Sequence, residues 1–291
     1  MSTLVLVATP IGNMGDLSPR AVDHLRTAGL VCCEDTRRTG LMLHNLGIDV
    51  PLLRVDEHTE LAAVDRIVDV LDRGHSVCLV TDAGSPGISD PGSRLVAAII
   101  ERGHDVSAVP GPAALIMALG VSGLPTDRFV FEGFLPRRGQ ERSERLDDVA
   151  RQSRTVIIYE APHRLTRTLA DLSAHCGGDR LVAVSRELTK LHEETWRGTL
   201  AAATAHFTDH EPVGEFVIVL AGAPPGPGAT EADIDRALTD SLATGASTKD
   251  AAAQVADTLS ISKKVAYDRA LALQSERRAV RDQSGRGANA N

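Results

Sequence analysis

Residues 4–19 read LVLVATPIGNMGDLSP and contain a strand pattern, a glycine-rich loop and a helix start, in that order. The apolar run at the beginning is typical of a buried strand. Ser18 followed by Pro19 favours a helix start, because a serine oxygen caps free backbone N–H groups and proline has none to cap. A strand that leads through a short loop into a helix predicts an α/β fold with a mostly parallel sheet.

Two further segments repeat this order. The run SVCLV leads into TDAGSPGISDP (residues 76–91), and DVSAV leads into PGP (residues 105–112). We expect Asp90 and Gly111 to cap the helices that follow, each before a proline, as Ser18 does. Loops at the carboxyl ends of parallel strands meet at one edge of the sheet, where open α/β folds bind ligands. A purely structural role in βα turns is the alternative for each loop taken alone.

The composition of the three loops limits the ligand. They match neither GxGxxG nor GxxxxGK(S/T), and they contain no Lys or Arg. Open helix N-termini and glycine amides can receive a carboxylate. S-adenosylmethionine fits these conditions, because it carries a carboxylate and a sulfonium cation but no phosphate chain. Asp82 and Asp16 are candidates to face the cationic end of that ligand, with a role as a cap as the alternative for either.

The overall composition is that of a globular protein. The chain has 291 residues, 43% of them hydrophobic and 24% charged, which predicts about two domains. Four cysteines without a CxxC spacing indicate buried thiols in a reducing compartment, and we expect a cytoplasmic protein. No apolar run approaches the roughly 20 residues of a membrane helix, and the scattered histidines give no metal-ligand spacing. We therefore expect neither a membrane partner nor a metal.

Segments rich in Gly and Pro and changes in sequence pattern divide the chain into three parts. We expect an N-terminal α/β domain over residues 1–120 and a second α/β domain over residues 125–222, which is rich in short β-branched runs. The segment APPGPG (residues 223–228) should be a linker. An Ala-rich helical domain is expected over residues 229–282.

Charge is unevenly distributed. The net charge of −8 argues against general affinity for nucleic acid, because phosphate binding needs a local excess of Lys and Arg. Residues 136–154 and 263–286 do contain such an excess. Solvent-exposed helix faces with ordinary ion pairs are the alternative interpretation of both stretches.

Eight motifs resemble one known family. They occur in a fixed order over residues 1 to about 222 and read TPIGNMGDLSPRA, CCEDTRRT, TDAGSPGISDPG, VPGPAAL, FEGFLPRRG, YEAPHR, RELTKLHEE and GEFVIVL. Together they resemble the ribosomal RNA small subunit methyltransferase I group within the tetrapyrrole methylase family. The resemblance implies two α/β subdomains of the class III S-adenosylmethionine methyltransferase type, followed by a small C-terminal helical domain.

The resemblance also implies an activity. It is methylation of a cytidine ribose 2′-hydroxyl in small-subunit (16S) ribosomal RNA or in a ribosomal particle, with S-adenosylmethionine as donor and a homodimer as the working form. The family pattern has Asn before Glu-His where this chain has Asp56, so the roles of Glu57 and His58 stay open. A tetrapyrrole (precorrin-type) C-methyltransferase and a non-catalytic RNA-binding factor are the alternatives. An NAD-dependent enzyme is disfavoured because its fingerprint is missing.

The resemblance assigns a set of residues to the donor cleft. They are Thr9, Pro10, Gly12, Asn13, Asp82, Ala83, Gly84, Ile88, Ala113, Ala114, Tyr159, Leu188, Gly214 and Glu215.

Methyl transfer to a hydroxyl benefits from a proton acceptor, and carboxylates past strand ends can face the cleft. We predict Asp35 or Glu160 in this role. The residues predicted to hold RNA are Arg37, Arg137, Arg138, Arg164, Arg186 and Lys190. Interdomain ion pairs or helix caps are the alternative for each of them.

Overall fold

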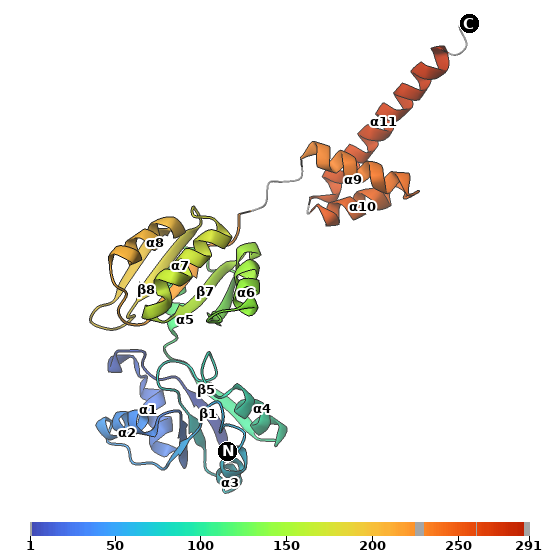
Figure 1. Cartoon of the computed structure of the whole chain (residues 1–291). Helices are drawn as coiled ribbons and strands as arrows, with labels where there is room; N and C mark the ends of the chain where they lie inside the picture. The colour runs from blue at the N-terminus through green and yellow to red at the C-terminus, as the bar shows by residue number, and fades with distance from the viewer. Residues whose placement is uncertain (1, 225–229, 260, 288–291) are drawn as a thin grey trace. The chain divides into compact units, whose positions relative to one another are not determined.

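The computed structural model describes residues 2–224, 230–259 and 261–287, with side chains up to residue 275. The chain forms two compact units, Met1–Ala223 and Pro224–Asn291 (Figure 1). The first unit contains two five-stranded sheets, and the second is helical. The predicted fold class, two α/β sheets with a helical C-terminal region, is confirmed.

The first sheet is parallel throughout and has the strand order β3-β2-β4-β1-β5. Its strands are β1 (Thr3–Val7), β2 (Leu30–Cys33), β3 (Leu52–Arg54), β4 (Val77–Leu79) and β5 (Asp105–Val109). Its helices are α1 (Pro19–Thr27), α2 (Thr36–Asn45), α3 (Val64–Asp72) and α4 (Ser93–Glu101), with a short 3-10 turn η1 (Met14–Asp16) before α1. Apolar side chains of α1 and α2 pack on one face, and those of α3 and α4 pack on the other. The sheet is therefore buried on both faces, as its near-continuous apolar strands indicate.

The helix starts after the three loops differ from one another. Ser18 caps α1, and its Oγ accepts the Ala21 N–H at 3.1 Å, as predicted. The predictions for Asp90 and Gly111 are wrong. Helix α4 begins only after Gly92, because the Gly87 N–H donates to the Pro91 carbonyl at 3.2 Å and closes a turn first. Helix α5 (Ala114–Ser122) begins after Ala113.

The second sheet has mixed strand directions and the order β6-β7-β10-β8-β9. Its strands are β6 (Phe129–Phe134), β7 (Thr155–Glu160), β8 (Leu181–Arg186), β9 (Glu194–Thr199) and β10 (Phe216–Leu220). Only β6 and β7 pair in parallel, so the expectation of a mostly parallel arrangement holds for the first sheet alone. The helices α6 (Gln140–Arg151), α7 (Pro162–Cys176) and α8 (Leu200–Asp209) supply side chains to the core of one face.

Helix α5 covers the other face of the second sheet. Leu115, Ala118 and Leu119 pack in one cluster with side chains of β7, β8 and β10. The helix is apolar on all sides, yet Ile116 and Met117 are 43% and 44% exposed. An apolar surface that faces outward on a helix of this kind is typical of an interaction site.

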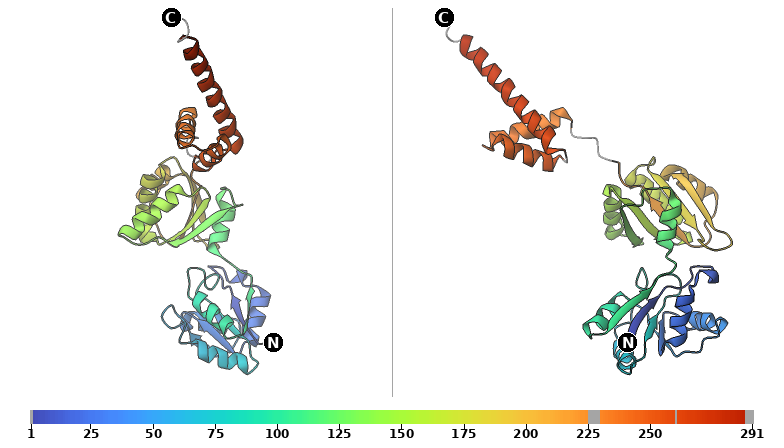
Figure 2. Two further views of the ribbon diagram at one scale, coloured as in Figure 1. Left: turned by 90° about the vertical axis from the view of Figure 1, so that its right-hand side faces the viewer. Right: turned by 180° about the vertical axis from the view of Figure 1, so that it is seen from behind.

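The C-terminal unit consists of α9 (Glu231–Ala243), α10 (Thr248–Thr258) and α11 (Lys263–Gly287), shown from two further sides in Figure 2. Its small core includes Leu238, Ala251 and Ala270. Among the helices of residues 2–224, 230–259 and 261–287, none is long and apolar enough to cross a bilayer.

Candidate functional site

A cleft of about 460 Å³, here named the central cleft, is lined by residues of both sheets. The first-sheet side comes from the loop after β4 and from the start of α5, and the second-sheet side comes from the end of β7 and the start of β10. The lining includes these residues predicted to bind the donor: Asp82, Ala83, Gly84, Ile88, Ala113, Ala114, Tyr159 and Glu215. Glu160, predicted as a proton acceptor, lines it as well.

Hydrogen bonds hold the three glycine-containing loops together at the carboxyl ends of the first sheet's strands. Thr9 and Gly84 exchange both backbone hydrogen bonds, at 2.9 and 3.0 Å. Gly84 has φ +91°, a conformation that side-chain-bearing residues rarely adopt. The Ser85 hydroxyl donates to the Pro112 carbonyl at 3.2 Å. The loops after β1, β4 and β5 therefore form one connected wall.

The second sheet contributes an aromatic contact to the same wall. The Tyr159 hydroxyl accepts the Leu115 N–H at 3.1 Å, at the first turn of α5. Phe131 and Phe134 pack edge-on against the Tyr159 ring. Burial raises the pKa of Tyr159, so this hydroxyl stays protonated at neutral pH.

The charge of the central cleft is mainly negative. Its lining carries the carboxylates of Glu34, Asp82, Asp90, Glu160 and Glu215 against the single guanidinium of Arg38. Arg38 donates to Asp82 at 3.0 Å. Glu160 and Glu215 pair with Arg164 and Lys190, so that among the described residues Glu34 and Asp90 are the lining carboxylates without an ion pair. Their negative charge suits a ligand with a positive charge.

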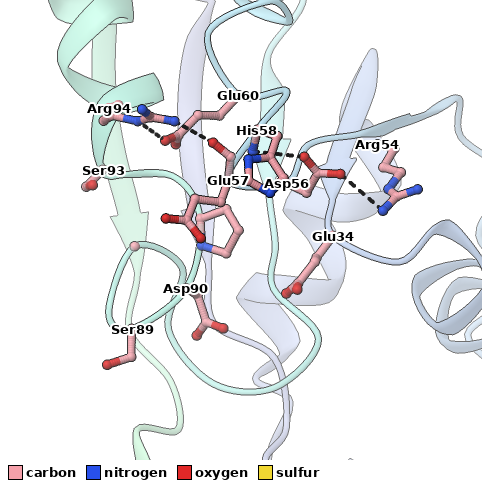
Figure 3. A pocket seen from close by; sticks show the side chains of 12 residues that line it. Glu34, Arg54, Asp56, Glu57, His58, Glu60, Ser89, Asp90, Ser93 and Arg94 are labelled. Carbon is pink, nitrogen blue, oxygen red and sulfur yellow. Dashed lines mark hydrogen bonds and ion pairs between the residues drawn. The ribbon is translucent and has the colours of Figure 1, made fainter. Parts of the chain in front are cut away.

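A second hollow, here named the acidic pocket, has a volume of about 750 Å³ (Figure 3). Both hollows have Glu34, Ser89 and Asp90 in their linings. Glu57 and His58, whose roles the sequence left open, line the acidic pocket. Their turn is held by Asp56.

The turn at residues 56–60 also anchors the loop after β4. Asp56 Oδ1 accepts the backbone N–H groups of His58 and Thr59, each at 3.0 Å. Glu60 is 3% exposed and accepts the buried Gly92 N–H at 2.9 Å, and it forms an ion pair with Arg94. The sequence analysis missed Glu60. The signal that could have found it was the acidic segment DEHTE that follows β3.

The comparisons with known proteins decide the family. The sequence profile of the family described as Tetrapyrrole (Corrin/Porphyrin) Methylases matches residues 3–204. This chain belongs to the tetrapyrrole methylase family. A second profile, described as the RsmI C-terminal HTH domain, matches residues 228–274 of this tetrapyrrole methylase. The predicted family is thereby confirmed.

Relatives within the family share one name. A protein of Synechocystis sp. named Ribosomal RNA small subunit methyltransferase I is 45% identical over 278 residues, which cover 95% of this chain and 100% of that protein. The Pseudomonas aeruginosa protein of the same name is 43% identical over 280 residues, 94% of this chain and 98% of its own.

Solved structures share the tetrapyrrole methylase fold. The methyltransferase CobJ has a TM-score of 0.57 and 20% identity, over 78% of this chain and 98% of its own. The uroporphyrin-III C-methyltransferase from Thermus thermophilus, complexed with S-adenosyl homocysteine, has a TM-score of 0.51 and 19% identity, over 75% of this chain and 97% of that one.

The other residues predicted for the donor lie outside the central cleft of this tetrapyrrole methylase. Thr9 and Pro10 line a separate hollow of about 220 Å³, and the Thr9 hydroxyl donates to the Thr81 carbonyl. Asn13 caps the 3-10 turn η1. Gly12 lies against Lys190, so that an added Cβ would overlap its Cγ. Leu188 belongs to the apolar cluster under α5, and Gly214 lies against Glu187.

The two predicted proton acceptors make several contacts of their own. Asp35 caps α2 and holds Arg37 with both carboxylate oxygens, at 3.1 and 2.7 Å. These hydrogen bonds lower the pKa of Asp35, which makes it a weak base. Glu160 is 2% exposed and accepts hydrogen bonds from the Thr168 hydroxyl at 2.6 Å and the Ala161 N–H at 2.9 Å.

The residues predicted to hold RNA fall into two groups. Arg137 and Arg138 are exposed in the loop between β6 and α6. The other predicted cations make contacts within the protein: Arg37 with Asp35, Arg164 with Glu160 and the Leu135 carbonyl, Arg186 with the His192 carbonyl, and Lys190 with Glu187 and Glu215. Arg142, in the same basic stretch as Arg137, is 4% exposed and bound to Asp171, so it is a structural residue. Within the described residues, no cluster of His, Cys, Asp or Glu is placed to hold a metal ion.

Proposed function

We propose that this protein transfers the methyl group of S-adenosylmethionine to a cytidine ribose 2′-hydroxyl of small-subunit (16S) ribosomal RNA. The observation that carries the proposal is the central cleft, built from the loops of one sheet and the strand ends of the other. The name of relatives that match almost the entire chain supports the RNA substrate. The free cysteines, three of them buried, support a cytoplasmic location for the reaction.

The cleft fits the donor in size and charge. A volume of about 460 Å³ lies in the range of small-ligand sites, roughly 300–1,000 Å³. The excess of carboxylates would attract the sulfonium and amino groups, and the open N-terminus of α5 at Ala113 and Ala114 would receive the donor carboxylate. The solved uroporphyrin-III C-methyltransferase of the same fold is described as a complex with S-adenosyl homocysteine, the demethylated donor.

The donor residues outside the cleft lining belong to the proposal in a supporting role. Thr9 fixes the conformation of Gly84 through two backbone hydrogen bonds, and Gly12 permits the close approach of Lys190. Lys190 in turn binds Glu187 and Glu215, at 2.9 and 2.8 Å. These contacts order the cleft wall.

When bound, the donor supplies an activated methyl group. The protein must hold the hydroxyl oxygen in line with the methyl–sulfur bond, exclude water and accept the hydroxyl proton. Asp35 and Glu160 remain predictions for the last task.

RNA binding by an acidic protein requires local positive surfaces. The exposed pair Arg137 and Arg138 is one candidate, and the C-terminal unit, proposed as a separate domain over residues 229–282, is another. The domain division at residues 1–120 and 125–222 is part of the proposal. Either an isolated RNA or an assembled particle satisfies this chemistry.

We further propose that the working form is a homodimer. Helix α5 is apolar on all sides, and Ile116, Met117 and Val121 on its outer side are between 42% and 44% exposed. A second copy of the same helix would cover this surface, as twofold-symmetric interfaces do.

Methyl transfer from labelled S-adenosylmethionine tests the function. We expect label on 16S RNA or on small ribosomal subunits, located at a 2′-oxygen by nucleoside analysis after complete digestion. A uroporphyrinogen acceptor in a parallel reaction tests the alternative, tetrapyrrole C-methylation. Label on the tetrapyrrole, or an RNA product methylated on a base, would overturn the proposal.

A further inference from the structure

We propose that Asp90 is the residue that accepts the proton of the attacking hydroxyl, which reaches it from the side of the acidic pocket. The inference rests on the proposed function and extends it to a further catalytic residue. It is carried by the position of Asp90, by its lack of an ion-pair partner among the described residues and by the backbone that presents it.

Asp90 lies where two hollows meet. It lines both the central cleft, proposed for the donor, and the acidic pocket, together with Glu34 and Ser89. Figure 3 shows Glu34 and Asp90 on separate segments at the same end of the acidic pocket, away from Arg94. An acceptor at this junction can contact a hydroxyl group that enters from the pocket side while the methyl group comes from the cleft side.

Most other carboxylates around the two hollows are engaged. Ion pairs join Asp82 to Arg38, Asp56 to Arg54, Glu60 to Arg94, Glu160 to Arg164 and Glu215 to Lys190. Among the described residues, no Arg, Lys or His forms an ion pair with Asp90 or Glu34. Since α4 starts after Gly92, the Asp90 side chain does not serve as its cap either.

The backbone around Asp90 is held in an unusual conformation. Ser89 has φ +58°, which is uncommon for a residue with a side chain, and Gly87 and Gly92 have φ of +79° and +131°. The Glu60 carboxylate fixes the end of this loop through the buried Gly92 N–H. Strained backbone that its surroundings hold in place is concentrated at functional sites.

The environment of Asp90 suits a base that works near neutral pH. Burial raises the pKa of Asp90 to about 6, and the negative charges of Glu34 and Asp82 add to the rise, while the Thr81 hydroxyl opposes it. Burial raises the pKa of Glu34 as well, helped by the charge of Asp82. The other charged and titratable groups that line the two hollows are Arg38, Arg54, Asp56, Glu57, His58, Glu60, Arg94, Tyr159, Glu160 and Glu215.

The direction of the pH dependence follows from the role. A base must be ionised to accept a proton, so activity should rise as the pH increases through about 6 and become constant above it. At neutral pH Asp90 is mostly ionised, yet it holds a proton more strongly than an exposed aspartate does.

The step balances in atoms and charge. The 2′-oxygen forms a bond to the methyl carbon as the bond between that carbon and sulfur breaks, and the bonding electron pair stays on sulfur. The products are the 2′-O-methyl ribose and neutral S-adenosyl homocysteine. The hydroxyl proton moves to the Asp90 carboxylate and from there to solvent.

Single-turnover methylation of small ribosomal subunits tests the role. We expect Asp90→Asn to lower the rate at saturating S-adenosylmethionine by about 10²- to 10⁴-fold, the usual contribution of a general base. Loss of this cleft charge should also weaken donor binding, and saturation with the donor separates that effect from the chemical step. Asp90→Glu keeps a carboxylate, so its rate should be at least about tenfold higher than that of Asp90→Asn. The wild-type rate should show an acid limb with an apparent pKa near 6, which Asp90→Asn should lack.

The control is Asp69→Asn, which removes one exposed carboxylate from α3, a helix packed on the first sheet. Its rate should equal that of the wild type. An Asp90→Asn rate within threefold of wild type overturns the proposal while leaving the proposed function intact, provided that the wild type methylates RNA. A wild-type profile without an acid limb also overturns it, even if Asp90→Asn does not fold. If the wild type transfers no methyl group to RNA, the proposed function fails and the role of Asp90 fails with it.

Discussion

Glu60→Ala should lower the free energy of unfolding of the unit Met1–Ala223 far more than the deletion of an ordinary surface ion pair does. The Glu60 side chain is 4% exposed, it pairs with Arg94 and it accepts the buried Gly92 N–H. Its removal leaves that N–H without an acceptor, which costs about 1–3 kcal/mol. Loss of the pair with the half-exposed Arg94 adds at most about 1 kcal/mol.

The chain contains a matched control. Asp65 pairs with Arg102, whose side chain is 52% exposed, close to the 54% of Arg94, but the Asp65 side chain is 84% exposed. The two pairs therefore differ mainly in the burial of the carboxylate. Asp65→Ala should change the free energy of unfolding by about 0–1 kcal/mol.

Urea denaturation followed by circular dichroism measures both variants, and hydrogen exchange of the Gly92 amide shows whether the loss is local. Glu60→Gln retains one acceptor oxygen and should fall between wild type and Glu60→Ala. Equal destabilisation by Glu60→Ala and Asp65→Ala, with unchanged exchange at Gly92, would refute the reasoning that burial of this carboxylate decides its contribution.

Three further variants test other parts of the site. Gly84→Val should abolish donor binding measured by calorimetry, because Gly84 has φ +91° beside the cleft. The control Gly103→Val, at φ +81° with open space around it, should bind the donor normally. Equal donor affinities of the two variants would show that the loop of residues 81–91 is not part of the donor site. Arg137→Ala combined with Arg138→Ala should weaken RNA binding and reduce its salt slope by roughly 0.7–0.9 for each phosphate that is no longer neutralised, while an unaltered slope would make this loop an ordinary solvated surface. Met117→Glu should convert a dimer into monomers by light scattering, and a persistent dimer would place the interface elsewhere.

Local chemistry explains which elements the sequence predicts. Ser18 before Pro19 caps α1 because serine needs only the next few residues to do so. Asp90 before Pro91 has the same pattern, yet a turn between Gly87 and Pro91 forms first and delays the helix. The outcome depends on contacts with Glu60, about thirty residues earlier, which no local pattern contains.

Pairing between distant strands limited the prediction of the second sheet. The β-branched run in the motif GEFVIVL forms β10, but its antiparallel placement between β7 and β8 is set by packing rather than by its own residues. The edge strand β9 has the sequence ETWRGT, whose polar residues gave no strand signal.

The candidate site was predictable where glycine and proline mark it. The 81–91 loop carried its own signal, and its residues line the cleft. The pKa of a carboxylate had no such signal in the sequence. Asp35 and Asp90 are both aspartates in loops after strands, so the sequence alone does not tell which of them is the better base. Their neighbours distinguish them: Arg37 lowers the pKa of one, and burial raises the pKa of the other.

The strand order of the second sheet also determines how early during translation this sheet can fold. All strands of the first sheet have been made once Val109 is translated, whereas the second sheet needs β10, which ends at Leu220, roughly 110 residues later. At about 5–20 residues per second this delay is on the order of 5–20 s. In the last part of it, after Arg186 completes β8, β7 and β8 each present an open edge to other nascent chains, because the strand that fills the gap between them is the last of the sheet to be synthesised.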